Sequence, residues 1–109
     1  MGITKTDGFS LETIDLAEML KAVGHPARLS ILQYLSTMPG CICNDIVDEL
    51  PLAQPTISRH LSELKKVGLI KGSIEGKNIC YCIDEKQWQK LENILNEISK
   101  NLSCKDNCC

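Results

Sequence analysis

The stretch QPTISRHLSELKKVGLI, residues 54–70, constrains the fold more than any other part of this 109-residue sequence. Ile57, Leu61 and Leu64 recur at helical spacing and so form one apolar face, and Gly68 is suited to ending the helix. Directly after it, LIKGSI and ICYCI have the composition and alternation of strands, with the turn residues EGKN between them. The sequence therefore predicts a helix that passes at once into a two-stranded hairpin.

Three further helices are predicted before this one. The first follows the N-cap candidate Ser10 and ends at Gly24, and the second starts at Pro26, a residue that a first helical turn tolerates. The third runs from about Cys43 to Leu50 and is separated from the next helix by the short break PLA. The expected buried faces contain Leu11, Ile14, Leu16, Leu20 and Val23 in the first helix, and Leu29, Ile31, Leu32 and Leu35 in the second.

A last helix is predicted from about Glu85 to Leu102. Its apolar residues form a heptad seam that suits pairing with another helix. The alternative is a helix that lies on its own core, but a seam at the end of so small a chain favours a dimer. Residues 1–102 are expected to form one domain and residues 103–109 a flexible cysteine-rich tail. The seam residues are Trp88, Leu91, Leu95, Ile98 and Leu102.

The composition, 43% hydrophobic and 24% charged, is that of a globular protein. No run approaches the roughly 18 apolar residues of a membrane-spanning helix, and the acidic N-terminal segment does not resemble a signal peptide. A cytoplasmic protein without membrane contact is expected. The net charge is -2, yet residues 54–77 hold five basic against two acidic residues, whereas residues 1–53 hold three against seven. A local basic segment is what a nucleic-acid footprint requires, although it is also typical of a solvated face.

Helix, short break, helix and hairpin is the order of a winged helix-turn-helix, so the predicted fold class is mainly α with a small β-hairpin (α+β). In such a fold the second helix lies in a DNA major groove, about 12 Å wide, and the hairpin follows the adjacent backbone. Arg59 suits a bidentate contact with guanine or phosphate, and Gln54 suits adenine. The structural alternatives are helix capping for Gln54, partial burial for His60 and plain solvation for the lysines. The predicted DNA contacts are Gln54, Thr56, Ser58, Arg59 and His60 on the helix, and Lys71 and Lys77 on the hairpin.

Four stretches in order, HPARLSILQYL, CICNDIVDEL, QPTISRHLSELKKVGLI and GKNICYCID, resemble the ArsR/SmtB family of bacterial metal-sensing repressors, over about residues 10–102. The resemblance implies a homodimer of winged helix-turn-helix subunits, paired through the first and last helices. It also implies that the dimer binds a palindromic, double-stranded operator and releases it when metal binds. The same resemblance assigns DNA contacts to the five helix residues named above.

Seven cysteines is a high and odd count, and without an export signal it indicates metal or redox chemistry rather than a disulfide framework. By the same resemblance, Cys41 and Cys43 correspond to the cysteine ligands that the family's arsenical and cadmium or lead sensors carry at the start of the third helix. The usual third cysteine is replaced by Ile46, no cysteine precedes Cys41, and no histidine follows His60, as a zinc or nickel site of the last helix would need.

The tail can supply the missing thiolates. As(III) and Sb(III) bind three thiolates, so one tail cysteine would complete a site, whereas two would give a four-thiolate site suited to Zn or Cd. The predicted effector is therefore As(III) or Sb(III), with Cd, Pb or Zn as alternatives. The predicted metal ligands are Cys41, Cys43, Cys104, Cys108 and Cys109.

Cys80 and Cys82 share one face of the second strand, where they could bind metal. Cysteine also packs as a small hydrophobe, and packing or an incidental role is favoured.

Two rival functions stay open. A disulfide between Cys41 and a tail cysteine would make a redox-switched DNA-binding regulator, and a metal buffer or thiol-transfer factor would use the winged helix for protein contacts. An enzyme is not expected, because neither His25 nor His60 has a convincing acid or nucleophile beside it.

Overall fold

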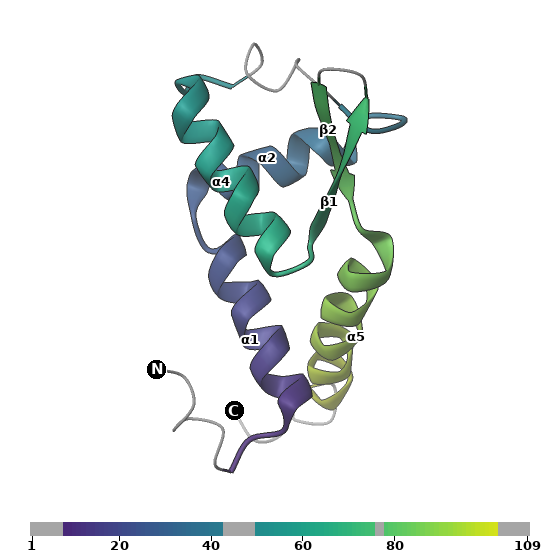
Figure 1. Ribbon diagram of the computed structural model, residues 1–109. Helices are drawn as coiled ribbons and strands as arrows, with labels where there is room; N and C mark the ends of the chain where they lie inside the picture. The colour runs from purple at the N-terminus through teal and green to yellow at the C-terminus, as the bar shows by residue number, and fades with distance from the viewer. Residues whose placement is uncertain (1–7, 43–49, 76–77, 103–109) are drawn as a thin grey trace.

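The computed structural model describes residues 8–42, 50–75 and 78–102. Its elements in chain order are α1 (Leu11–Val23), α2 (Pro26–Ser36), α4 (Gln54–Lys66), β1 (Ile70–Glu75), β2 (Asn78–Ile83) and α5 (Glu85–Leu102), as Figure 1 shows. This order confirms the predicted mainly α fold with a small antiparallel hairpin, the wing. The helix predicted from about Cys43 to Leu50 falls almost entirely in 43–49, outside the described residues.

Local capping chemistry sets the helix boundaries. The Ser10 hydroxyl accepts a hydrogen bond from the Thr13 N–H at 3.0 Å, which satisfies one of the free donors at the start of α1. Gly24 caps the other end of α1, as predicted. After α4, Gly68 has a φ of +85°, a left-handed conformation that glycine adopts without strain. This turn lets the chain pass from α4 into β1 within three residues.

The wing is a regular antiparallel ladder. Ile70 lies opposite Ile83, Lys71 opposite Cys82, and the ladder continues to the pair of Glu75 with Asn78. A separate bridge pairs Ile42 with Tyr81, so the chain that follows α2 lies along the outer edge of β2. β2 therefore has β1 on one side and the segment around Ile42 on the other.

One apolar core joins all the elements. Its residues come from one side of each helix and from the base of the wing. Two predicted core positions of α1 are wrong, because Leu11 is 75% exposed and Leu20 is 44% exposed, and Leu29 of α2 is 44% exposed as well. The buried residues of the core are Leu16, Met19, Ala22, Ile31, Leu32, Leu35, Ile57, Leu61, Leu64, Leu69, Ile70 and Leu91.

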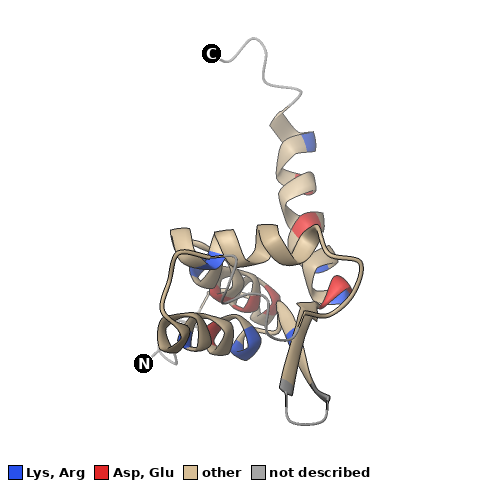
Figure 2. Cartoon of the chain, turned by 90° about the horizontal axis from the view of Figure 1, so that it is seen from above, with Lys and Arg blue, Asp and Glu red and all other residues tan. Residues whose placement is uncertain are grey.

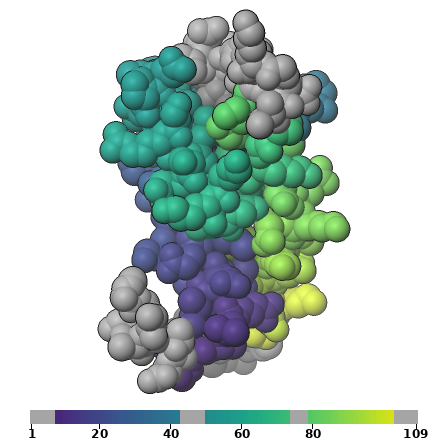
Figure 3. Space-filling model, in the orientation of Figure 1, coloured from purple at the N-terminus to yellow at the C-terminus, as the bar shows by residue number. Residues whose placement is uncertain are grey.

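The elements divide between two ends of the molecule. α2, α4 and the wing form one end, and α1 and α5 extend toward the other (Figures 1 and 3), while Figure 2 shows α5 projecting away from the rest of the molecule. α4 contacts α1, α2 and β1, and α2 also contacts the wing directly through β2. Among the described residues, no helix combines the length and apolar character needed to cross a membrane.

Candidate nucleic-acid interface and thiol site

α4 has one buried and one exposed side. Ile57 and Leu64 are at most 1% exposed and fix the helix against the core. Gln54, Ser58 and Arg59 are exposed on the other side, and Thr56 is half-buried. The N-cap residue is Ala53, which makes no side-chain capping bond, so the capping role considered for Gln54 is not seen. The polar residues predicted to read DNA are thus presented together by a helix whose back is anchored.

The wing contacts α4 through β1. The start of α4 and the free end of the wing are at the same end of the molecule in Figure 1. Lys71 is exposed on β1, whereas Lys77 lies outside the described residues. This arrangement lets a helix and a hairpin approach one extended partner together, which is the geometry of groove and backbone contact by a winged helix.

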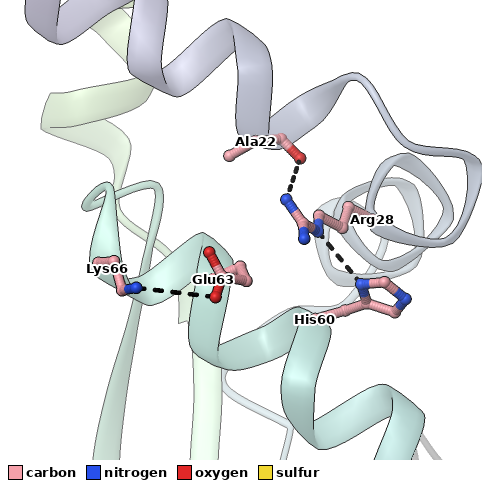
Figure 4. Close-up of polar contacts among 5 residues, drawn as sticks. All are labelled: Ala22, Arg28, His60, Glu63 and Lys66. Atoms are coloured by element: carbon pink, nitrogen blue, oxygen red, sulfur yellow. Dashed lines mark hydrogen bonds and ion pairs between the residues drawn. The ribbon is translucent and has the colours of Figure 1, made fainter. Parts of the chain in front are cut away.

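His60 differs from its neighbours on α4 because its side chain is buried, with 8% exposure. The Arg28 Nε–H donates to His60 Nδ1 at 3.1 Å, and the Arg28 Nη1 donates to the Ala22 carbonyl at 3.4 Å, as Figure 4 shows. The His25 ring lies against the His60 ring, with centroids 4.5 Å apart. This placement fits the alternative of a satisfied, partly buried histidine rather than a base contact.

The surroundings of His60 favour its neutral form. Burial lowers the pKa of the imidazole, and the charges of its neighbours lower it further, while one carboxylate opposes them. Because Nδ1 accepts a hydrogen bond from Arg28, that nitrogen has no proton of its own. The neighbours that lower the pKa are His25, Arg28 and Arg59, and Glu63 raises it.

Charged residues of both signs occur on α1, α4 and α5, as Figure 2 shows. On α4, Glu63 forms an exposed ion pair with Lys66 at 3.7 Å, and such surface pairs contribute little to stability. Arg59, Lys65 and Lys71 make no ion pair in the described part of the chain. These cations are available for phosphate contacts.

The structure brings the two C-x-C pairs together. A disulfide joins Cys41 to Cys82, across 41 positions of sequence, and the Cα atoms are 4.4 Å apart. The incidental or packing role favoured for Cys82 is therefore wrong. Cys80 is buried and is disulfide-bonded as well.

The predicted metal ligands are only partly within the described residues. Cys41 is exposed beside β2, whereas Cys43, Cys104, Cys108 and Cys109 lie outside. Among residues 8–42, 50–75 and 78–102, no group of three or more His, Cys, Asp or Glu side chains is placed to hold a metal ion. The five-cysteine ligand set therefore stays a prediction.

Sequence reasoning missed two residues of this region. Arg28, which supports His60, left no signal beyond its place in the second helix, because its partner lies 32 positions away. Cys82 did leave a signal: two C-x-C pairs in one chain are matched in spacing, so they can align residue for residue when their segments run side by side.

Comparisons with known proteins agree with this geometry. Residues 25–71 match the family model described as bacterial regulatory protein, arsR family. An uncharacterised helix-turn-helix transcriptional regulator of Methanocaldococcus jannaschii is 47% identical over 64% of this chain and 80% of its own length. The arsenical resistance operon repressor of Staphylococcus xylosus is 27% identical, over 84% of this chain and 90% of that protein. A cadmium resistance transcriptional regulatory protein of Staphylococcus aureus is 30% identical, over 80% and 72%.

Solved structures show the same fold. An ArsR-like transcriptional regulator from Rhodococcus superposes with a TM-score of 0.70 at 22% identity, covering 85% of this chain and 87% of the other. A homodimeric winged helix-turn-helix domain from Mycobacterium bovis gives 0.64 at 24% identity, covering 92% and 96%. With the helix, the wing and the exposed polar side of α4 in place, the chain belongs to the arsR family of transcriptional regulators, which are DNA-binding proteins and not enzymes.

Proposed function

We propose that the protein is a transcriptional repressor that binds double-stranded operator DNA through α4 and the wing. The observation that carries this proposal is the two-sided character of α4: Ile57 and Leu64 are buried while Gln54, Ser58 and Arg59 face outward. Arg59 would contact guanine or phosphate, and the short side chains would let the helix approach the backbone closely. The remaining proposed contacts are Thr56 on α4 and Lys71 and Lys77 on the wing. The proposed site of action is the cytoplasm.

Arg59→Ala tests the DNA proposal. Loss of a bidentate contact should weaken operator binding by about 1–3 kcal/mol, measured by fluorescence anisotropy with DNA from the promoter of its own gene. Lys90→Ala, which removes an exposed cation from α5, is the matched control and should leave affinity unchanged. If the unmodified protein showed no salt-sensitive DNA binding, the proposal would fail and the metal-buffer alternative would gain support.

The proposed repressor acts as a homodimer paired through α1 and α5. Leu95, Ile98 and Leu102 are 45%, 53% and 61% exposed on α5, and Leu11 and Leu20 are exposed on α1. α1 and α5 contact each other, so exposed apolar side chains of both helices can contribute to the proposed dimer surface. The Mycobacterium bovis neighbour is described as homodimeric, which supports a homodimer here.

The proposed effector is As(III) or Sb(III), bound by Cys41, Cys43 and one of Cys104, Cys108 and Cys109. Cys41 is exposed, and its soft sulfur fits a thiophilic ion once the disulfide is reduced. The names of the Staphylococcus xylosus and Staphylococcus aureus relatives, which refer to arsenical and cadmium resistance, support a metal effector. Cd, Pb or Zn, bound with a second tail cysteine, is the alternative.

Arsenite added to the reduced dimer on its promoter DNA tests the effector. A tenfold loss of affinity corresponds to about 1.4 kcal/mol of coupling, and we expect at least that. X-ray absorption should find three sulfur neighbours around arsenic, and serine at Cys41 or Cys43 should remove them. Unchanged DNA affinity with arsenite, together with release by Cd²⁺ or Zn²⁺, would transfer the assignment to the divalent metals.

A further inference from the structure

Two backbone hydrogen bonds align the chain after α2 with the wing. The Ile42 N–H donates to the Tyr81 carbonyl and the Tyr81 N–H donates to the Ile42 carbonyl, both at 2.8 Å. In an antiparallel pair, the residues next to such a doubly bonded pair face each other with Cα atoms about 4.5 Å apart. Cys41 and Cys82 occupy that position at 4.4 Å. The backbone ladder therefore places the two sulfurs opposite each other.

This cysteine pair is open to small molecules. Cys41 is exposed and Cys82 half-buried, whereas Cys80, two residues earlier on β2, is only 2% exposed. Cys41 and Cys82 line an open groove of about 1090 Å³ between α2, the wing and the start of α5, with Lys71 and Trp88 also in its lining. Lys71 lies opposite Cys82 in the hairpin. The thiolate is the form of a cysteine that attacks a disulfide.

We propose that Cys41 and Cys82 form a reversible disulfide that controls metal binding by withdrawing Cys41 from the effector site. The other reactant is a low-molecular-weight organic disulfide. The Cys41 thiolate, the more exposed, attacks one of its sulfurs, and a small thiolate leaves and takes up a proton. The Cys82 thiolate then attacks the Cys41 sulfur of the mixed disulfide and releases the second small thiol. The two cysteines lose two electrons and two protons, and the organic disulfide gains them as two thiols.

The effect on metal binding rests on the proposed function, in which Cys41 is a ligand. A thiolate is the metal ligand, and a sulfur held in a disulfide is no longer one. The oxidised protein then offers one thiolate fewer than the three that As(III) takes. The regulator would therefore respond to a soft metal only when its thiols are reduced.

The first test is the disulfide itself. No Lys or Arg separates Cys41 from Cys43 or Cys80 from Cys82, so a tryptic cross-link between the two peptides does not identify which cysteines are joined. The full-length Cys43→Ser/Cys80→Ser variant removes this ambiguity. After reduction and treatment with oxidised glutathione, mass spectrometry should find the Cys41–Cys82 peptide pair, and dithiothreitol should release it. If Cys41 and Cys82 stay open to alkylation, the proposal fails.

The second test is metal binding by the otherwise unmodified protein. Cd²⁺ is titrated into reduced and oxidised samples, followed by thiolate-to-metal charge-transfer absorption, and arsenite binding is measured in parallel by equilibrium dialysis. We expect at least tenfold weaker binding by the oxidised protein. Reduced Cys82→Ser, checked for fold by circular dichroism, should bind like the reduced protein. After oxidation its Cys41 should keep the small thiol as a mixed disulfide, found by mass spectrometry and removed by dithiothreitol. Cys82→Ala serves the same purpose if the serine variant is unfolded.

The outcomes separate the two proposals. Equal metal binding by the reduced protein and by protein shown to hold the Cys41–Cys82 disulfide would overturn the regulation and remove Cys41 from the proposed ligands. Release of DNA by arsenite, which tests the effector, would not be affected. Loss of metal binding by reduced Cys82→Ser would also overturn the regulation, since Cys82 would then be a ligand itself. A reduced protein that binds neither ion would overturn the effector assignment and with it the control of metal binding, even if the peptide pair is found.

Discussion

α4 and α5 have the same kind of apolar row in their sequences but opposite surroundings. On α4, Leu61 and Leu64 are 5% and 0% exposed, whereas on α5 Leu95 and Ile98 are 45% and 53% exposed. Only Leu91, near the start of the α5 row, is buried in the core. Helical spacing thus identifies a face but not what covers it. On α4 the chain's own core covers the row, whereas on α5 most of the row is exposed, as the proposed dimer requires.

The largest effect that tests this comparison is expected on α4. Leu64→Ala should lower the free energy of unfolding by about 2–5 kcal/mol, because the side chain is fully buried and its removal leaves a cavity. Denaturant unfolding measures this. Leu95→Ala, measured at concentrations too low for dimerisation, should change the same quantity by less than about 0.5 kcal/mol. Equal losses of unfolding free energy for Leu64→Ala and Leu95→Ala would contradict the contrast between the buried row of α4 and the exposed row of α5.

A smaller effect is expected on α5, in the dissociation of the proposed dimer rather than in the free energy of unfolding. Ile98→Asp should weaken the dimer by about 1.5–3 kcal/mol per chain, the value of burying one such side chain, with little change in the folded monomer. Sedimentation velocity over a concentration series measures the dissociation constant. Asn96→Asp adds the same charge at an exposed position off the seam and should leave the dimer intact. A dimer unaffected by Ile98→Asp would place the partner surface elsewhere.

The smallest effect concerns His60, the titratable group within the buried side of α4. Its pKa is lowered in the folded chain, so the unfolded chain binds the proton more tightly. The free energy of unfolding should therefore fall as the pH drops below about 6.5, the ordinary pKa of histidine, toward the lowered value. His60→Asn keeps an acceptor for Arg28 and should flatten that part of the pH profile, measured by thermal unfolding. An unchanged profile would show that His60 is not responsible.

Much of the fold was predictable because its signals are local. Ser10, Gly24 and Gly68 act through neighbours within a few residues, and the structure has each at the helix end where the sequence predicts it. α5 runs over the residues expected, Glu85–Leu102. The buried face of α1 was less predictable, because Leu11 and Leu20 continue the apolar pattern onto a side that the core does not reach.

The site was predictable where one helix presents it and not where distant segments meet. The exposed positions of Gln54, Ser58 and Arg59 follow from the period of α4 alone. The contact of Cys41 with Cys82 depends on a ladder between segments 41 residues apart, whose register no local pattern specifies. Residue type indicated thiol chemistry, but the tertiary arrangement decided which thiols meet.

Asp84 is the one residue between the wing and α5. Its side chain accepts hydrogen bonds from the N–H groups of Lys86 and Gln87, at 3.1 and 3.3 Å, and its own N–H donates to the Leu69 carbonyl at 2.9 Å. A junction of one residue that is held by hydrogen bonds on both sides cannot itself absorb a rotation of β2. A turn of the wing, whether imposed by DNA or by a bond at Cys82, must therefore also turn α5 or break these hydrogen bonds. The proposed DNA-binding end and the proposed dimer helix are thus joined by a single residue that is held on both sides.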